Sequence, residues 1–326
     1  MTQPVMIDLG EDGGLLRPDG SSVRPADVRN FLARQLTIPR KATDIVVFVH
    51  GWRNTPTTAE QRARQFFTLL EDRYRGERDR YPGLKGWQGY YVIVRWPSMS
   101  NPLPNGYLRI RNRAHAMTTE GRAAQVLGQL LGYLNTERRP PGSPPALRNA
   151  TGQYLHCVGH SFGGRFLVEA VQAAADKGPP ALAWNRPNPR YPYTVDTLLI
   201  FQMAARPDIF SGPFARILDD DAPINGPVIL THSRADRATG LWHRFAEGTP
   251  GIGHIGARTP PEEIGNAILH SVDEPYRHEE LESRIVNIDA GWLYRQGRWK
   301  NPAGAHSDFS YPESAHLMLS LAELAR

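Results

Sequence analysis

Cysteine is almost absent from this chain, which has Cys157 alone among its 326 residues. A single cysteine excludes an internal disulfide and fits a reducing compartment. No segment approaches the ~18 consecutive apolar residues that a membrane span needs. The first residues show neither the basic start nor the apolar core of a secretory signal. We therefore expect a cytoplasmic protein with no integral membrane segment.

Motifs for metals and nucleotides are also missing. The histidines do not cluster at zinc spacing, and neither an H-E-x-x-H sequence nor a phosphate-binding G-x-x-x-x-G-K-[ST] loop occurs. The triplet at 219–221 is acidic but lacks the spaced ligands of a calcium loop, which predicts a solvated loop there. We expect no metal and no cofactor.

The chain has only a small excess of positive over negative charge. The net charge of +5 comes from 38 lysines and arginines against 33 acidic residues. One basic cluster, at 109–113, is typical of a solvated loop or helix face, and no nucleic-acid-binding module accompanies it. We therefore expect no nucleic-acid partner, and the sequence leaves the oligomeric state open.

The chain does have a regular alternation of strand and helix patterns. Runs of β-branched and aromatic residues predict strands at 45–49, 90–96, 154–158, 195–202, 227–233 and 284–289. Apolar residues at helical spacing predict helices at 25–35, 59–74, 118–134, 162–176 and 313–325. Continuous apolar strands are typical of parallel sheets buried on both faces. The pattern predicts an α/β fold with a mostly parallel central sheet and helices on both faces.

The alternation begins near residue 44, which sets the expected domain organisation. Residues 1–43 are polar and rich in glycine, proline and arginine, so we expect an N-terminal extension packed on a single domain at 44–326. Within that domain, 97–117 and 240–283 lack clear periodicity. We expect these two segments to be lid-like insertions.

One pentapeptide has a chemical meaning in this context. Residues 159–163 read Gly-His-Ser-Phe-Gly, a G-x-S-x-G motif placed between a predicted strand and a predicted helix. Such a motif predicts a nucleophile elbow, in which a sharp turn exposes the serine above the sheet. Glycines are needed because the turn strains the backbone and brings strand and helix close together. Ser161 is therefore a candidate nucleophile.

A serine hydroxyl needs a base within hydrogen-bond reach and a group that orients the base. His306 lies after the last predicted strand and just before the last helix, which makes it the candidate base. Two aspartates are candidates for the orienting acid. Asp236 follows the strand at 227–233, and Asp208 follows the preceding strand, so Asp208 stays open as the alternative acid.

Several motifs in this order closely resemble the α/β-hydrolase superfamily of serine esterases and lipases. The matching pieces are Phe48-Val-His-Gly-Trp52, the pentapeptide at 159–163, Ala235-Asp236 and Gly304-Ala-His306. The resemblance extends from about residue 44 to the C-terminus. The segments His50 to Thr55, Ala205 to Asp208 and Asp236 to Ala238 resemble a little-characterised bacterial subgroup.

The resemblance implies an α/β-hydrolase fold and a catalytic triad of Ser161, His306 and Asp236. It also implies an oxyanion hole formed by the backbone N–H groups of Trp52 and Phe162. The implied activity is hydrolysis of a small-molecule or lipid carboxylic ester through an acyl-enzyme on Ser161. Acyl transfer or amide hydrolysis by the same triad stays open, and so does a non-catalytic binding module with a hydrolase fold.

Overall fold

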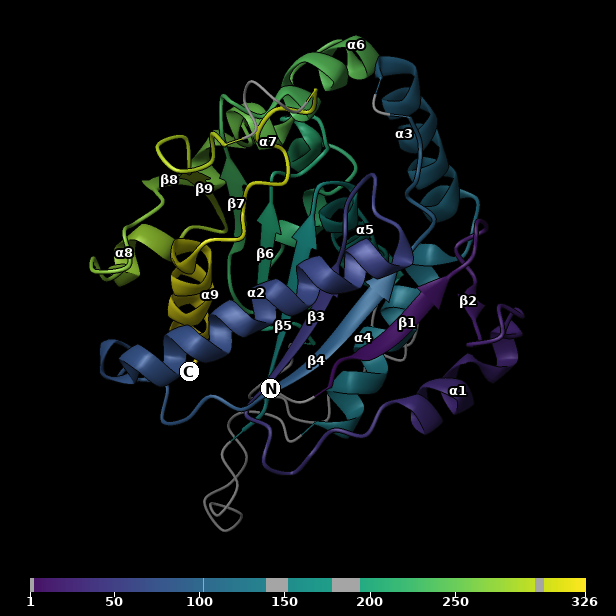
Figure 1. Ribbon diagram of the computed structural model, residues 1–326, viewed down its shortest axis with the longest axis horizontal. Coiled ribbons are helices and arrows are strands. Elements are labelled where there is room, and N and C mark those ends of the chain that lie inside the picture. Colours follow the sequence, from purple (N-terminus) through teal and green to yellow (C-terminus); the bar gives the residue numbers. More distant parts are fainter. Residues whose placement is uncertain (1–2, 102, 139–151, 178–193, 297–301) are drawn as a thin grey trace.

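The computed structural model describes residues 3–101, 103–138, 152–177, 194–296 and 302–326. Within these residues, nine strands form one sheet in the order β2-β1-β4-β3-β5-β6-β7-β9-β8 (Figure 1). The strands are β1 (Val5–Leu9), β2 (Leu15–Leu16), β3 (Asp44–Val49), β4 (Gly89–Arg95), β5 (Tyr154–His160), β6 (Thr197–Phe201), β7 (Val228–His232), β8 (Ile264–Ile268) and β9 (Ile285–Asp289).

Every pairing between these strands is parallel except that of β1 with β2. In the middle of the sheet, β3 runs beside β5 from the Asp44–Tyr154 pair to the Val49–Gly159 pair. Since parallel strands need crossover connections, helices lie between successive strands. The carboxyl ends of β3, β5, β6 and β7 therefore meet at one edge of the sheet.

Helices cover both faces of the sheet, as Figure 1 shows for α2 and α9 on one face. The helices are α1 (Val28–Gln35), α2 (Pro56–Glu77), α3 (Pro104–Thr119), α4 (Ala123–Glu137), α5 (Phe162–Lys177), α6 (His243–Glu247), α7 (Ile252–Ile255), α8 (His278–Leu281) and α9 (Pro312–Leu324). In the described residues, this mostly parallel sheet with helices on both faces is an α/β-hydrolase fold. The predicted fold class is confirmed.

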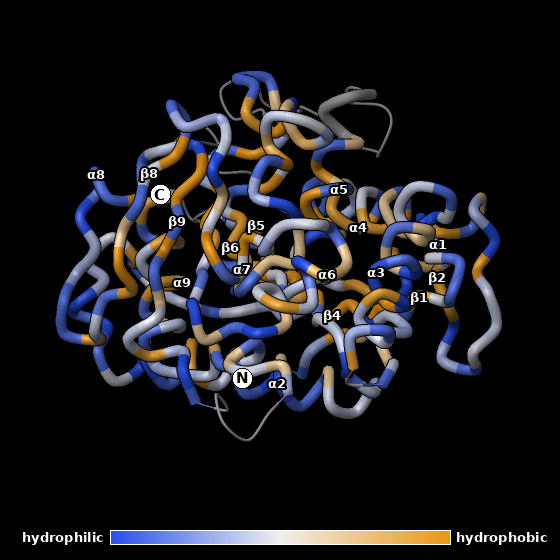
Figure 2. Tube along the Cα trace, turned by 90° about the horizontal axis from the view of Figure 1, so that it is seen from above, coloured by the Kyte–Doolittle hydropathy of each residue, from blue (hydrophilic) through white to orange (hydrophobic). Residues whose placement is uncertain are grey.

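The two faces of β3 belong to two different hydrophobic clusters. Ile45, Val47 and Val49 pack in the cluster that contains α1, α3, α4 and α5. Val46 and Phe48 pack with α2 and α9 on the opposite face. Alternation of this kind follows from the pleat of a strand, and each such side chain contributes about 1.5–3 kcal/mol when fully buried. Figure 2 shows the apolar stretches gathered along the central strands, with polar loops around them.

Residues 3–43, where the sequence predicted a packed extension, form β1, β2 and α1. β1 pairs with β4 in the register Val5–Val92, so these residues extend the sheet itself. The Arg95 guanidinium bonds the Asp8 carboxylate across that pairing at 2.6 and 2.8 Å. The domain boundary near residue 44 stays a prediction.

The two segments expected to be irregular have more regular structure than their sequences indicated. Residues 104–119 form α3, whose buried face includes Tyr107, Ile110, Ala114 and Met117 at helical spacing. Arginines between these positions hide the pattern in the sequence. In the second segment, β8 adds an edge strand to β9, and all five of its residues are at least partly exposed. Whether either segment acts as a lid stays a prediction.

A buried ion pair joins the end of α4 to the start of β6. Arg138 and Asp196 bond each other, and both side chains are 0% exposed. We expect Arg138→Met to lower the free energy of unfolding by about 3–5 kcal/mol, because the Asp196 carboxylate stays buried without the guanidinium. Urea denaturation measures this loss.

The matched control is Arg75→Met, which removes an arginine from an exposed pair with Asp72. Exposed pairs contribute less than about 1 kcal/mol. Equal losses in the two variants would contradict the prediction.

Candidate active site

Ser161 occupies a strained turn between the end of β5 and the start of α5. Its φ of 56° lies in the left-handed region, which few residues other than glycine adopt. Two glycines make the turn sterically possible. A Cβ on Gly159 would lie 2.3 Å from the Gly164 Cα, and a Cβ on Gly51 would lie 2.7 Å from the Ser161 Cβ. The tight strand–turn–helix connection therefore depends on both glycines.

The structure brings Ser161, His306 and Asp236 into one hydrogen-bonded chain. The His306 Nε2 lies 2.8 Å from the Ser161 Oγ, and the His306 Nδ1 lies 2.8 Å from the Asp236 Oδ2. The Ser161 and Asp236 residues are 0% exposed, and His306 is 2% exposed. This arrangement can move a proton from the serine hydroxyl to the imidazole while the carboxylate holds the ring.

Two further groups hold the Asp236 carboxylate in place. The backbone N–H of Thr239 donates to Oδ1 at 3.0 Å, from the π-helical turn η7 (Ala238–Trp242). The Gln202 amide donates to Oδ2 at 3.2 Å and also to the Ala305 carbonyl at 2.9 Å. Gln202 thus connects the carboxylate to the loop that carries His306.

Gln202 was not among the site residues predicted from the sequence. Gln202 directly follows β6 and is fully buried, and its backbone has a positive φ of 48°. One signal was available, because polar residues at the carboxyl ends of parallel strands gather at the ligand-binding edge of a sheet.

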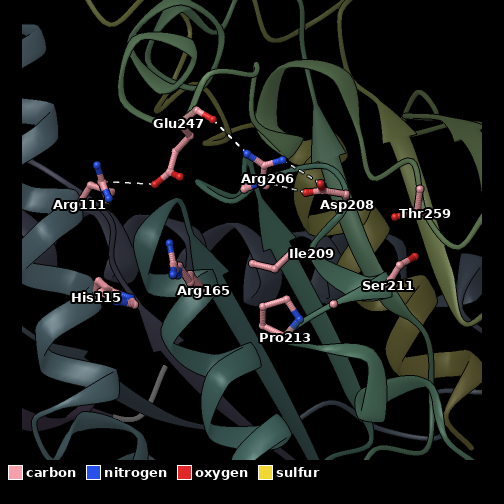
Figure 3. A pocket seen from close by; sticks show the side chains of 11 residues that line it. Arg111, His115, Arg165, Arg206, Asp208, Ile209, Ser211, Pro213, Glu247 and Thr259 are labelled. Atoms are coloured by element: carbon pink, nitrogen blue, oxygen red, sulfur yellow. Dashed lines mark hydrogen bonds and ion pairs between the residues drawn. The ribbon is translucent and has the colours of Figure 1, made fainter.

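Asp208, the alternative acid, is not brought to His306. It forms a two-pronged pair with Arg206 at 3.0 and 2.8 Å, and its side chain is 51% exposed. The bond to Arg206 lowers the pKa of this carboxyl below its ordinary value. Figure 3 shows both residues at the side of a pocket formed with α3 and α5.

His160, next to the elbow serine, bonds to the loop of the candidate base. Its Nε2 lies 2.6 Å from the His306 carbonyl oxygen, so this nitrogen carries the proton and donates. Burial lowers the pKa of His160 well below its ordinary value, which keeps the ring neutral. His160 therefore fixes the backbone of His306.

His50 and Asn54 hold the loop that follows β3. The Gly51 carbonyl lies 2.8 Å from the His50 Nδ1 and accepts a bond from the Asn54 side-chain amide at 2.9 Å. The backbone N–H of Trp96 donates to the His50 Nε2 at 3.1 Å, so the His50 ring carries its proton on Nδ1. Desolvation lowers the pKa of His50 to about 4.

These two bonds on Gly51 determine the direction of the next N–H group. In a trans peptide the C=O of Gly51 and the N–H of Trp52 point in opposite directions. Holding the carbonyl therefore aims the Trp52 N–H away from His50 and Asn54. Within the described part of the chain, neither this N–H nor that of Phe162 donates to a protein acceptor. Both groups predicted for an oxyanion hole are thus open donors.

Aromatic rings pack around the elbow from three elements. The Tyr107 ring of α3 lies 5.4 Å from both the Trp52 and the Phe162 rings, measured between centroids. The Trp242 ring of η7 lies 5.3 Å from that of Trp52. Trp96 is also buried, and its ring stacks on that of His50.

The described residues contain neither a cluster of metal ligands nor a helix that could span a membrane. No group of three or more His, Cys, Asp or Glu side chains there is arranged to hold a metal ion. None of the described helices combines the length and apolar character that a bilayer crossing requires.

Known proteins offer distant structural similarity. No protein-family model and no curated protein matches the chain. A dienelactone hydrolase from Anabaena variabilis ATCC 29413 is similar at 16% identity and a TM-score of 0.35, over 86% of each chain. A lipase-esterase related protein from Clostridium acetobutylicum ATCC 824 has 10% identity and a TM-score of 0.26, over 82% of this chain and 89% of that one. Values this low do not transfer an activity to this chain.

The neutral His50 predicts acid sensitivity. The folded-state pKa of about 4 lies below the ordinary 6.5, so below pH ~6.5 the unfolded chain takes up a proton that the folded chain refuses. Stability from His50 is fully present above pH ~6.5 and falls toward pH 4, by about 2–3 kcal/mol. Urea denaturation at pH 7.5 and 4.5 measures the fall.

Substitution of His50 separates this effect from general acid denaturation. We expect His50→Asn to be less stable at pH 7.5 but to lose less stability between the two pH values. His278→Asn, which changes an exposed histidine, serves as the control and keeps the wild-type pH dependence. An unchanged pH dependence in His50→Asn would contradict the assignment.

Proposed function

We propose that the protein is a serine hydrolase that cleaves carboxylic esters through an acyl-enzyme on Ser161. The observation that carries this proposal is the unbroken chain of 2.8 Å contacts from the Ser161 Oγ through His306 to Asp236. The elbow geometry supports it, because a strained turn is a costly conformation that tends to persist at functional sites.

In the proposed first step, the Ser161 oxygen attacks the ester carbonyl while the His306 Nε2 takes its proton. Asp236 keeps the His306 proton on Nδ1 and stabilises the imidazolium. The same imidazolium then protonates the departing alcohol. Water, activated by His306, attacks the acyl-serine and restores the free hydroxyl.

Negative charge develops on the carbonyl oxygen during each attack. The Trp52 and Phe162 N–H groups are the proposed donors for this oxyanion. Phe162 is the first residue of α5, where backbone N–H groups have no partner within the helix and the helix dipole favours negative charge. His50 and Asn54 are proposed to position the Trp52 donor through the Gly51 carbonyl.

Two neighbouring functions use the same fold. Acyl transfer or amide hydrolysis needs the same triad and differs only in the acceptor or the leaving group. A non-catalytic binding module would not need the serine–histidine–aspartate contacts, so their geometry favours an enzyme.

A fluorophosphonate probe tests the proposed nucleophile directly. We expect wild-type protein to be labelled and Ser161→Ala to remain unlabelled, since only an activated serine attacks this probe. Hydrolysis of p-nitrophenyl esters should fall at least ~10³-fold in Ser161→Ala. Absence of labelling in the wild-type protein, or equal labelling of the variant, refutes the proposal.

A matched pair of aspartate variants tests the proposed acid in the same assay. Asp236→Asn should lose most labelling and hydrolysis while the protein stays folded, because the amide favours the wrong tautomer of His306. Asp208→Asn should behave like the wild type. The reverse result would assign the acid to Asp208.

Asn54 provides a test of the oxyanion loop. We expect Asn54→Ala to lower kcat about tenfold with little change in KM, because the Gly51 carbonyl loses one of its two donors and the Trp52 N–H is aimed less well. Inhibition by a boronic acid, which mimics the tetrahedral intermediate, should weaken by a similar factor. Steady-state kinetics and inhibitor titration measure both effects.

Asn101→Ala is the control, because it changes an exposed asparagine that does not contact this loop. A purely structural role for Asn54 would alter stability and leave kcat and boronate affinity unchanged in the folded protein. That outcome would remove Asn54 from the site.

A further inference from the structure

A pocket of about 560 Å³ lies between α3, α5, α6 and the loop after β6 (Figure 3). Its lining includes three arginines, two carboxylates and a histidine: Arg111, Arg165, Arg206, Asp208, Glu247 and His115. Nothing in the proposed ester chemistry uses these side chains. Their number in one cavity calls for a physical account.

Two of the helices that line the pocket, α3 and α5, also carry aromatic rings at the elbow. On α3, Tyr107, Arg111 and His115 are spaced four residues apart and so lie on one helix face. Tyr107 packs on Phe162 at the start of α5, and Arg165 follows one helical turn later. The two helices thus bring aromatic rings together near Ser161 and basic side chains together about one turn farther away.

Each of the three side-chain nitrogens of Arg206 has a protein partner. Its Nε and one terminal nitrogen bond Asp208, and its other terminal nitrogen bonds the Glu247 carbonyl at 3.0 Å. Arg206 therefore has a structural role, in which it joins Asp208 to the Glu247 carbonyl.

Arg165 and Arg111, in contrast, have donors left over. Within the described residues, Arg165 bonds only Glu169, through Nε at 3.1 Å, so both of its terminal nitrogens lack a protein acceptor. Arg111 donates to the Ala246 carbonyl at 3.3 Å, and its Nε faces Glu247 at 3.3 Å without hydrogen-bond alignment. Figure 3 shows Arg111 beside the Glu247 carboxylate and Arg165 below it, both lining the pocket.

Buried polar atoms without partners mark the same region. Arg111 and Thr259 line the pocket, and among the described residues the buried Arg111 Nε and Thr259 Oγ1 have no hydrogen-bond partner. One turn before Arg111 on α3, the buried Tyr107 hydroxyl has no hydrogen-bond partner in the described part of the chain either. A buried polar atom without a partner is unfavourable, and a polar ligand that supplied the partner would offset this cost.

We propose that this pocket holds a carboxylate or phosphate group carried by the ester substrate. The inference rests on the proposed function, and it adds the substrate class: esters with an anionic group beyond the scissile bond. Guanidinium forks match the oxygens of such groups two at a time. Arg206 and Arg111 have acidic partners in the pocket lining, whereas the Glu169 partner of Arg165 does not line it. The pocket therefore has an excess of donors and of positive charge.

Anion binding is measured first without any turnover. Isothermal calorimetry with inorganic phosphate and with glutarate should show saturable binding to the wild-type protein. We expect Arg165→Gln and, separately, Arg111→Gln to weaken binding about 10- to 100-fold, as loss of a hydrogen bond to a charged group does. Arg244→Gln, an exposed arginine on α6 outside the pocket, should bind as the wild type does. Two independent pocket variants keep the test decisive if one of them does not fold.

Substrate preference is measured next, with the neutral p-nitrophenyl butyrate and the anionic mono-p-nitrophenyl glutarate. The wild type should favour the glutarate ester in kcat/KM, and Arg165→Gln should lose at least tenfold of that preference while retaining hydrolysis of the butyrate. No phosphate or glutarate binding, or equal binding in the pocket variants, overturns the proposal. Anion binding with an unaltered ester preference overturns the substrate role. Anion binding that the pocket variants weaken, without hydrolysis of either ester, would refute the proposed function and with it the substrate role, and would leave an anion site alone.

Discussion

The site depends on one strained backbone conformation, the positive φ of Ser161. Such a conformation costs about 1–3 kcal/mol, so the surroundings must impose it. β5 ends at the turn in the middle of the sheet, and the Ser161 N–H is held by the Phe201 carbonyl at 2.9 Å. The absence of side chains at Gly51 and Gly159 lets the neighbouring backbone come close enough to hold the turn. The buried sheet thus provides the rigidity on which the geometry of the serine depends.

Two buried histidines stabilise this geometry in the same physical way. His50 and His160 are both kept neutral by desolvation, and each bonds a backbone carbonyl next to a group of the proposed mechanism. A neutral imidazole can donate from one nitrogen and accept at the other, which a charged ring cannot do. Burial therefore has two results here. It excludes water from the Ser161–His306 contact, and it selects the protonation state of the residues that hold the surrounding loops.

Much of the fold could be predicted because the central strands are continuous apolar runs. The order of Ser161, Asp236 and His306 along the chain predicted that their side chains would lie close together. β1 was missed because it is short and its Asp8 pairs with Arg95 across the sheet, a contact that no local pattern reveals. Gln202 contacts Asp236 only in the folded structure, and a glutamine that follows a strand belongs to no recognisable sequence motif. Its role could therefore not be predicted. The pocket of Arg111 and Arg165 is likewise formed only when α3 packs against α5.

The pairing of β1 with β4 has a consequence for how the protein is made. Val5 pairs with Val92, so until the ribosome has synthesised β4 the only strand that β1 can pair with in the described sheet is the two-residue β2. Closing such a long loop is slow compared with local helix formation. Until then β4 presents an open edge, and open edges recruit strands from other molecules. We therefore expect the nascent chain to be most prone to aggregation between the synthesis of β4 and the docking of β1. Chaperone binding during this interval would protect the open edge of β4.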